Sequence, residues 1–230
     1  ATGWTSAAAL ANMKFDVPTS KFDRTMMTDY AAARANMIES QVRPNGITDR
    51  RIIAAMESIA RESFVPDQRK PVAYVDEDVP LAESGRYLIE AMAFARMLQQ
   101  AAVKPADNVL VVGAGSGYGA AILAALGSRV VALESSPALA GQARTKLEHL
   151  ANVKVVEAGL EGGAKAEGPF DVIVVEGRVG EVPHALLAQL ADGGRLVAVV
   201  GETEMAKARV YTSAGGAIAI RDAFDASIAA

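Results

Sequence analysis

The chain has 230 residues, of which 51% are hydrophobic and 22% charged, as expected for a globular protein with a well-filled core. Its formal net charge of −4 argues against a surface that coats nucleic acid, because phosphate binding needs a basic face. The absence of cysteine excludes disulfides, thiolate metal sites and a cysteine nucleophile, and two histidines are too few for most histidine-rich metal sites. No apolar run is long enough to span a membrane. We therefore expect a cytoplasmic protein with no metal, nucleic-acid or membrane partner.

Residues 1–26 show little periodicity, and their apolar run at 7–11 precedes the basic residues, which is the wrong order for a signal peptide. We interpret this segment as a flexible extension or an expression remnant, with a docking arm as the alternative. Residues 27–230 are predicted to form one domain, divided into a helical part (27–105) and a sheet-forming part (106–230).

Residues 28–69 have apolar side chains at spacings of three and four, which predicts two helical segments. The turn at 44–46 separates them, and Asp49 can cap the second. Residues 72–82 are expected to form an irregular or short-strand connector. Helical periodicity returns over 87–102.

After residue 105, strand-like and helix-like runs alternate. Apolar strands separated by helices predict a mainly parallel sheet with helices on both faces. The expected strands are 108–112, 129–133, 153–157, 172–175 and 195–200, and the expected helices are 118–126, 137–150 and 182–190. Residues 208–213 and 217–221 are expected to add an antiparallel edge pair.

A glycine-rich loop, VLVVGAGSGYG, fills residues 109–119, where the first expected strand turns into a helix. Gly113 permits a tight turn, and Gly115 lets the backbone approach a ligand. The dinucleotide fingerprint has its third glycine at the position of Tyr118, so the pattern here is GxGxG. This shift favours S-adenosylmethionine over NAD, whose pyrophosphate needs the helix N-terminus. A turn without a ligand is the alternative.

Glu134 closes the second expected strand, roughly 20 positions after Gly113, where a carboxylate can accept hydrogen bonds from both ribose hydroxyls. An exposed glutamate at a strand end is the simpler alternative. Together with the loop, Glu134 predicts an adenosyl ligand at the carboxyl ends of the strands.

Five stretches, in the same order along the chain, resemble the protein-L-isoaspartate O-methyltransferase family. They are 37–56 (MIESQVRPNGITDRRIIAAM), 61–80 (RESFVPDQRKPVAYVDEDVP), 109–121 (VLVVGAGSGYGAA), 168–177 (GPFDVIVVEG) and 182–201 (VPHALLAQLADGGRLVAVVG). The second is the most diagnostic, because generic methyltransferases lack it. The resemblance implies a Rossmann-like α/β methyltransferase fold for residues 27–230.

The family transfers a methyl group from S-adenosylmethionine to the carboxylate of an isoaspartyl or D-aspartyl residue in damaged protein. A protein or peptide with an isoaspartyl residue is therefore the implied partner. A carboxylate is already nucleophilic at neutral pH, so alignment with the sulfonium methyl is the main requirement. The candidate cofactor-binding residues are Gly113, Ala114, Gly115, Ser116, Gly117, Tyr118, Glu134, Ser135, Gly159 and Leu160.

The sequence departs from the family pattern at three places. Ile89 stands where the family has its substrate-side serine, and Val111 where it has an acid that positions the cofactor's amino-acid part. The family's Gly-Asp-Gly turn, whose aspartate meets the adenine amino group, reads Ala-Gly-Leu at 158–160. Glu157 and Glu161 stand near this turn as possible substitutes.

These departures leave the catalytic residues unassigned and two alternatives open. One is a catalytically inactive family member that acts as a binding or scaffold protein. The other is a methyltransferase with a different acceptor, for which Arg86 and Tyr87 would be the markers. The acidic run 76–78 is interpreted as substrate-side or solvated rather than as a metal site. The sequence carries no signal for an oligomeric state.

Overall fold

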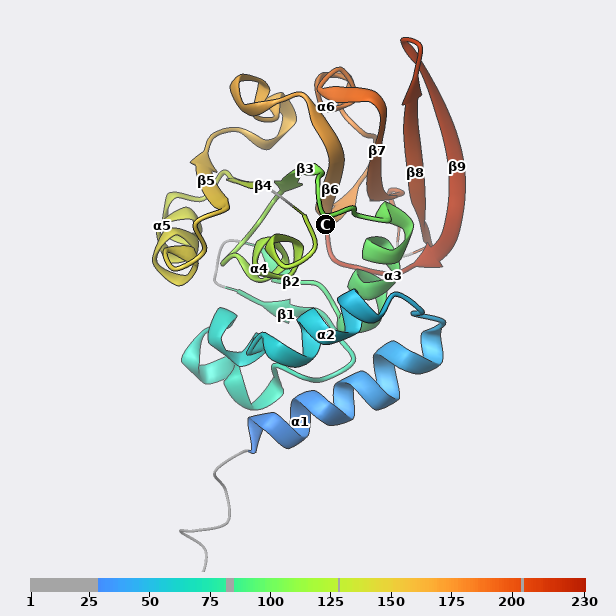
Figure 1. Cartoon of the computed structure of the whole chain (residues 1–230). Helices are drawn as coiled ribbons and strands as arrows, with labels where there is room; N and C mark the ends of the chain where they lie inside the picture. The colour runs from blue at the N-terminus through green and yellow to red at the C-terminus, as the bar shows by residue number, and fades with distance from the viewer. Residues whose placement is uncertain (1–28, 82–84, 128, 204) are drawn as a thin grey trace, which may run out of the picture.

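The computed structural model describes residues 29–81, 85–127, 129–203 and 205–230, so the extension predicted at 1–26 lies outside the described residues. Its centre is a seven-stranded sheet with the order β5-β4-β3-β6-β7-β8-β9 (Figure 1). Strands β3 to β7 run parallel, and β8 and β9 continue the sheet antiparallel. The strands are β3 (Asn108–Val112), β4 (Arg129–Glu134), β5 (Val153–Glu157), β6 (Phe170–Val179), β7 (Leu190–Val200), β8 (Ala206–Ala214) and β9 (Ala217–Ala226). The predicted fold and its antiparallel edge are confirmed.

The central strands are buried on both faces because their apolar residues run without interruption. Successive side chains of a strand point to opposite faces. Val109 and Val111 of β3 accordingly join a large hydrophobic cluster on one face, while Leu110 and Val112 join a smaller cluster on the other.

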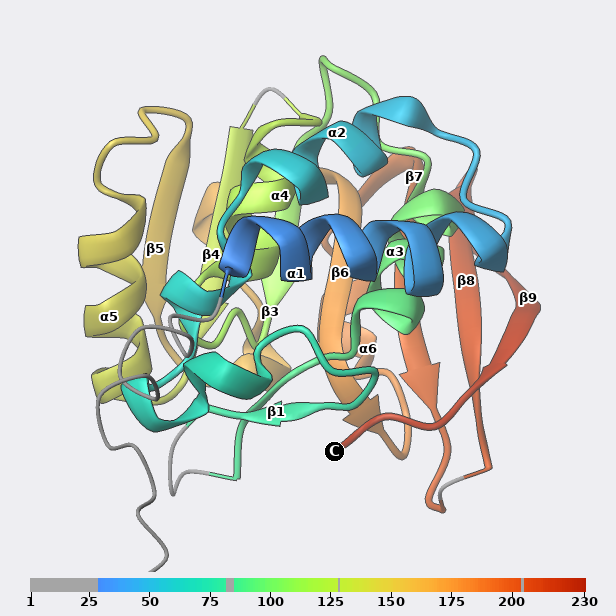
Figure 2. The same cartoon turned by 90° about the horizontal axis from the view of Figure 1, so that it is seen from below.

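Helices cover the two faces unequally. The helices are α1 (Tyr30–Met37), α2 (Arg50–Ser58), α3 (Ala91–Ala101), α4 (Tyr118–Ala124), α5 (Pro137–Leu147) and α6 (His184–Leu187). The first five contribute to the large cluster, and α6 packs on the opposite face (Figures 1 and 2). The helix expected at 182–190 has only four residues, because Leu190 already pairs with Phe170 in the sheet.

The N-terminal part is helical, as predicted, but its helices change type along the chain. α1 continues through a π-helical segment (Ile38–Val42) and a 3-10 segment (Arg43–Asn45). Asp49 caps α2 by accepting a hydrogen bond from the Arg51 amide, which confirms its predicted role. Two 3-10 segments follow α2, at Arg61–Phe64 and Asp67–Val72.

The prediction that helix α3 starts at residue 87 is wrong. Tyr87–Leu88 forms a short strand, β2, which pairs antiparallel with β1 (Val79–Pro80), and α3 begins at Ala91. Tertiary hydrogen bonds stabilise the extended backbone here: the Glu90 amide donates to Asp78 Oδ1 at 2.7 Å, and Arg61 Nη2 donates to the Ile89 carbonyl at 2.7 Å. Residues 86–89 are thereby held beside the ends of the central strands.

The strand order reverses between β3 and β6, which are neighbours although β4 and β5 come between them in the sequence. Ligands of open α/β sheets bind at such a switch point, outside the carboxyl ends of the strands. The register of β6 against β7 also shifts between Val174 and Arg178. Glu176 and Gly177 lie in this bulge, in the carboxyl-terminal half of β6. Within the described ranges, no helix has the length and hydropathy needed to cross a bilayer.

Candidate cofactor and acceptor site

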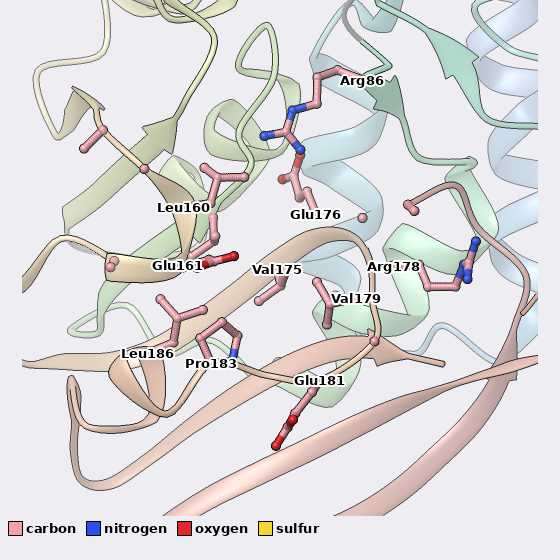
Figure 3. A pocket seen from close by; sticks show the side chains of 18 residues that line it. Arg86, Leu160, Glu161, Val175, Glu176, Arg178, Val179, Glu181, Pro183 and Leu186 are labelled. Carbon is pink, nitrogen blue, oxygen red and sulfur yellow. The ribbon is translucent and has the colours of Figure 1, made fainter. Parts of the chain in front are cut away.

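A cavity of about 1010 Å³ opens at the carboxyl ends of β3, β5 and β6 (Figure 3). Its position at the switch point and its size are those of a small-molecule site. Its walls come mainly from two loops, residues 158–163 after β5 and residues 175–181 at the end of β6, with Arg86 at the rim. Its charged lining residues are Arg86, Glu161, Glu176, Arg178 and Glu181.

The glycine loop is tied to the sheet by its own backbone. The amides of Gly113 and Ala114 both donate to the Leu133 carbonyl, at 2.9 and 3.0 Å. Gly113 has a φ of 79°, a left-handed conformation that favours glycine. Ser116 Oγ donates to the Phe64 carbonyl, which joins the loop to the N-terminal part.

Glu134 lies at the end of β4 with none of its side chain exposed. Its Oε2 accepts a hydrogen bond from the Gly115 amide at 2.8 Å, and its Oε1 accepts from the Ser135 and Ser136 amides, each at 2.8 Å. Arg86 Nη2 lies 3.4 Å from Oε1. The carboxylate therefore organises the glycine loop and the turn after β4.

The structure separates the candidate cofactor residues into two groups. Gly159 and Leu160 line the cavity, whereas Ala114, Ser116 and Tyr118 are buried. The Tyr118 ring contacts Phe64 and Phe94, an arrangement typical of core packing.

The two glutamates considered as partners for an adenine amino group also differ in position. Glu161 lines the cavity. Glu157 forms an exposed ion pair with Arg144, with Nη2 3.0 Å from Oε2. Glu161 is therefore the acid with access to a ligand.

A small niche adjoins the cavity, and we call it the acceptor niche because Ile89 lines it. Its walls are formed by Asp78, Arg86, Tyr87, Ile89, Gly113, Glu176, Gly177, Ala229 and Ala230. The branched side chain of Ile89 supplies no hydrogen bond. Arg86 and Glu176 are the charged residues shared by the niche and the cavity.

Residues 228–230 close one side of the acceptor niche. The Ala229 amide donates to Asp78 Oδ2 at 2.5 Å, and the Arg178 amide donates to the Ala229 carbonyl at 2.8 Å. Arg178 Nε donates to the Ile228 carbonyl at 3.2 Å. Asp78 thus has a structural role in this segment. Across the described ranges, no group of three or more histidine and carboxylate side chains is placed to bind a metal ion.

Sequence reasoning missed Glu176, whose carboxyl is enclosed at the base of the site. The residue as a whole is only partly buried, but its Oε1 has no solvent contact and no hydrogen-bond partner. Burial and the nearby Glu134 raise the pKa of Glu176 to about 8, and Arg61 opposes this shift. A Cβ on Gly119 would lie 1.6 Å from Glu176 Oε1, so the carboxyl rests on the first turn of α4.

Arg61 was also missed, and it is fully buried. Its Nε and Nη2 donate to the carbonyls of Ala73 and Ile89, each at 2.7 Å, and its guanidinium lies over the Tyr118 ring. Arg61 therefore fixes the backbone behind the acceptor niche.

A family model described as protein-L-isoaspartate(D-aspartate) O-methyltransferase matches residues 32–226, which is most of the chain. The chain belongs to this family. A relative from Koribacter versatilis, the protein-L-isoaspartate O-methyltransferase, is 43% identical over 181 residues, covering 78% of this chain and 81% of that protein. The corresponding protein of Methylorubrum populi is 42% identical, covering 76% of this chain and 82% of its own length.

Solved structures in the same family share the fold. A protein-L-isoaspartate O-methyltransferase superposes with a TM-score of 0.73 at 24% identity, covering 86% of this chain and 65% of that one. A Plasmodium falciparum protein in complex with S-adenosyl-L-homocysteine superposes with a TM-score of 0.72 at 20% identity, covering 87% of this chain and 96% of that one.

Proposed function

We propose that the chain is an S-adenosylmethionine-dependent methyltransferase that methylates isoaspartyl and D-aspartyl carboxylates in damaged proteins, and so acts in protein repair. The observation that carries this proposal is the match of the family model to residues 32–226, which include every lining residue of the cavity and the acceptor niche except Ala229 and Ala230. Neither the fold nor the comparisons favour a catalytically inactive member of the family.

The residues that line or adjoin the cavity fit the cofactor in their chemistry. The glycine loop and Ser135 surround Glu134, which would accept the ribose hydroxyls, and Gly159, Leu160 and Glu161 would bound the adenine. Bound S-adenosylmethionine supplies an electrophilic methyl group on a sulfonium. The protein must then hold a carboxylate in line with that methyl group and keep water out.

The proposal also concerns the acceptor. The acceptor niche holds only about 10 Å³, so an isoaspartyl residue in a protein or peptide would enter by moving apart its walls at Tyr87 and at the segment 228–230. Since Ile89 cannot donate a hydrogen bond, the acceptor carboxylate must find another donor in this chain.

The activity is tested with a pair of peptides that differ only in an isoaspartyl or a normal aspartyl linkage. We expect S-adenosylmethionine to bind in a calorimetric titration and methyl transfer to occur only to the isoaspartyl peptide. Binding without transfer to that peptide would point to a different acceptor. No heat at millimolar ligand would refute the methyltransferase assignment.

Replacing Glu134 by glutamine should weaken S-adenosylmethionine binding roughly tenfold to a hundredfold, because hydrogen bonds to a charged group contribute about 1.5–3 kcal/mol. Glu157 offers a matched control, since it pairs with Glu134 across the neighbouring strands but is exposed. Glu157→Gln should leave the affinity unchanged. Equal effects of the two substitutions in the titration would remove Glu134 from the cofactor site.

We also propose that residues 27–230 form one cooperative unit in the cytoplasm. One hydrophobic cluster includes residues from Met37 to Ile228, which supports a single domain and a single unfolding transition. The cysteine-free composition fits a reducing compartment, and cell fractionation tests the location.

A further inference from the structure

Arg86 lies between the cofactor side and the acceptor side of the site. Its Nη2 is 3.4 Å from Glu134 Oε1 and 3.2 Å from Ser135 Oγ, and its side chain is 22% exposed. The same residue lines both the cavity and the acceptor niche. Figure 3 shows its side chain reaching from the rim toward Glu176.

The hydrogen-bonding capacity of Glu134 is nearly filled in this arrangement. A carboxylate has about four acceptor positions on its two oxygens. Two backbone amides, the Ser135 hydroxyl and Arg86 approach Oε1, and the Gly115 amide approaches Oε2. Among these donors, Arg86 is the one whose side chain also lines the cavity. The carboxylate is also completely shielded from solvent. Arg86 must therefore move before a ribose can bind to Glu134.

We propose that Arg86 is a gate between the two sides of the site: its guanidinium rests on Glu134 in the free protein, and binding of the nucleoside turns it toward the acceptor niche, beside which it binds the acceptor carboxylate. This inference rests on the proposed function and assigns a residue to acceptor recognition. It also orders the two binding steps, with the nucleoside first.

The contacts of Arg86 suit such a movement. A separation of 3.4 Å makes a weak ion pair, which a ligand can displace. Gly85, with a φ of 68°, precedes Arg86 and gives the backbone freedom to adjust. Beside the niche, the guanidinium would supply the donors that the Ile89 side chain lacks, and its planar fork matches a carboxylate bidentately.

The charged groups around Arg86 leave its charge available to an acceptor. Arg86 contacts Glu134, and Asp78 and Glu176 line the niche with it. Asp78 is engaged by the Glu90 and Ala229 amides. Glu176 holds its proton near neutral pH, because burial raises its pKa to about 8. Once a ribose occupies Glu134, Asp78 is the charged carboxylate left in the niche, and because an amide already donates to each of its oxygens, an acceptor carboxylate can compete with it for the guanidinium.

Calorimetric titration with S-adenosylhomocysteine tests the first half of the proposal. This ligand has no sulfonium charge, so removing a cation from the site does not favour it electrostatically. We expect Arg86→Met to bind it about two- to fivefold more tightly than the native protein, as expected for loss of a weak competing ion pair. Arg178→Met is the control, because Arg178 lines the same cavity but donates to Ile228 and Gly201 carbonyls instead of Glu134. Its affinity should not rise.

Unchanged or weaker binding to Arg86→Met, with the native protein binding normally, would overturn the gate and leave the proposed function intact. Binding to neither protein would overturn both. Thermal melting of each variant confirms that the proteins compared are folded.

Steady-state kinetics with the isoaspartyl peptide test the second half. Arg86→Met should raise the KM for the peptide roughly tenfold to a hundredfold, which is the loss expected for a charge-assisted hydrogen bond. The KM of Arg86→Lys should lie between those of the native protein and Arg86→Met. Structural damage would weaken the binding of both ligands. If Arg86 is a gate, the same variant should bind the nucleoside more tightly and the peptide more weakly. A KM that stays at the native value would overturn acceptor recognition by Arg86.

Discussion

Replacing Arg61 by methionine is expected to lower the free energy of unfolding by about 3 kcal/mol, because two buried carbonyls lose a charged donor. Arg61 is fully buried and donates to the Ala73 and Ile89 carbonyls at 2.7 Å. Each unsatisfied buried group costs about 1–3 kcal/mol. Urea denaturation of the two proteins gives the difference directly.

The expected loss of about 3 kcal/mol already includes an effect that stabilises the methionine variant. Burial lowers the pKa of Arg61, and its Nη1 has no hydrogen-bond partner, so methionine also removes an unfavourably buried charge. We expect the two lost carbonyl bonds to outweigh this relief. Arg61→Lys, which keeps the charge but not the fork, should be intermediate. A methionine variant as stable as the native protein would mean that the carbonyls of Ala73 and Ile89 find other donors.

Replacing Glu176 by glutamine should change how stability depends on pH. The pKa of Glu176 is raised from an ordinary value of 4.5 to about 8 in the folded protein. Between these pH values the folded state holds one more proton than the unfolded state, so the free energy of unfolding falls as the pH rises. The stabilising contribution is complete below pH 4.5 and is lost as the pH passes through 8. Glutamine cannot titrate and removes this slope.

At pH 8 the glutamine variant should be more stable than the native protein by on the order of a few kcal/mol, while near pH 4 the two should be similar. Denaturation curves across this range measure the difference. Glu90→Gln is a matched comparison, because burial and Asp78 raise the pKa of Glu90 to about 7. That variant should remove only the part of the slope below about pH 7. If the free energy of unfolding depends on pH in the same way for the native and Glu176→Gln proteins, the Glu176 carboxyl is not held protonated in the folded state.

The sheet could be predicted from the sequence because its strands are continuous apolar runs. The bounds of β3 and β5 agree with the expected ranges 108–112 and 153–157. The start of α3 could not be predicted in this way. Its periodicity extends back to Tyr87, but hydrogen bonds from Glu90 to Asp78 and from Arg61 to Ile89 hold that segment extended. Such contacts join residues far apart in the chain and leave no local pattern.

The residues of the site also divide into those that could be predicted from a local pattern and those that could not. Glu134 was found because an acid closes an apolar strand at the expected distance from the glycine loop. Glu176 directly follows the expected apolar strand 172–175, so the same signal was present in the stretch 168–177. It was missed because that stretch was used only as a family resemblance. The burial of Arg61 had no comparable signal, since it depends on two backbone carbonyls supplied by other segments.

The hydrogen bond between Asp78 and the Ala229 amide spans 151 residues of the sequence and closes the acceptor niche. During synthesis from the N-terminus, the glycine loop, β4 and the loop after β5 all emerge well before residue 229. A nascent chain can therefore assemble the nucleoside side of the site while its acceptor side is still open. The capacity to select an acceptor is completed last, after β9 has joined the edge of the sheet.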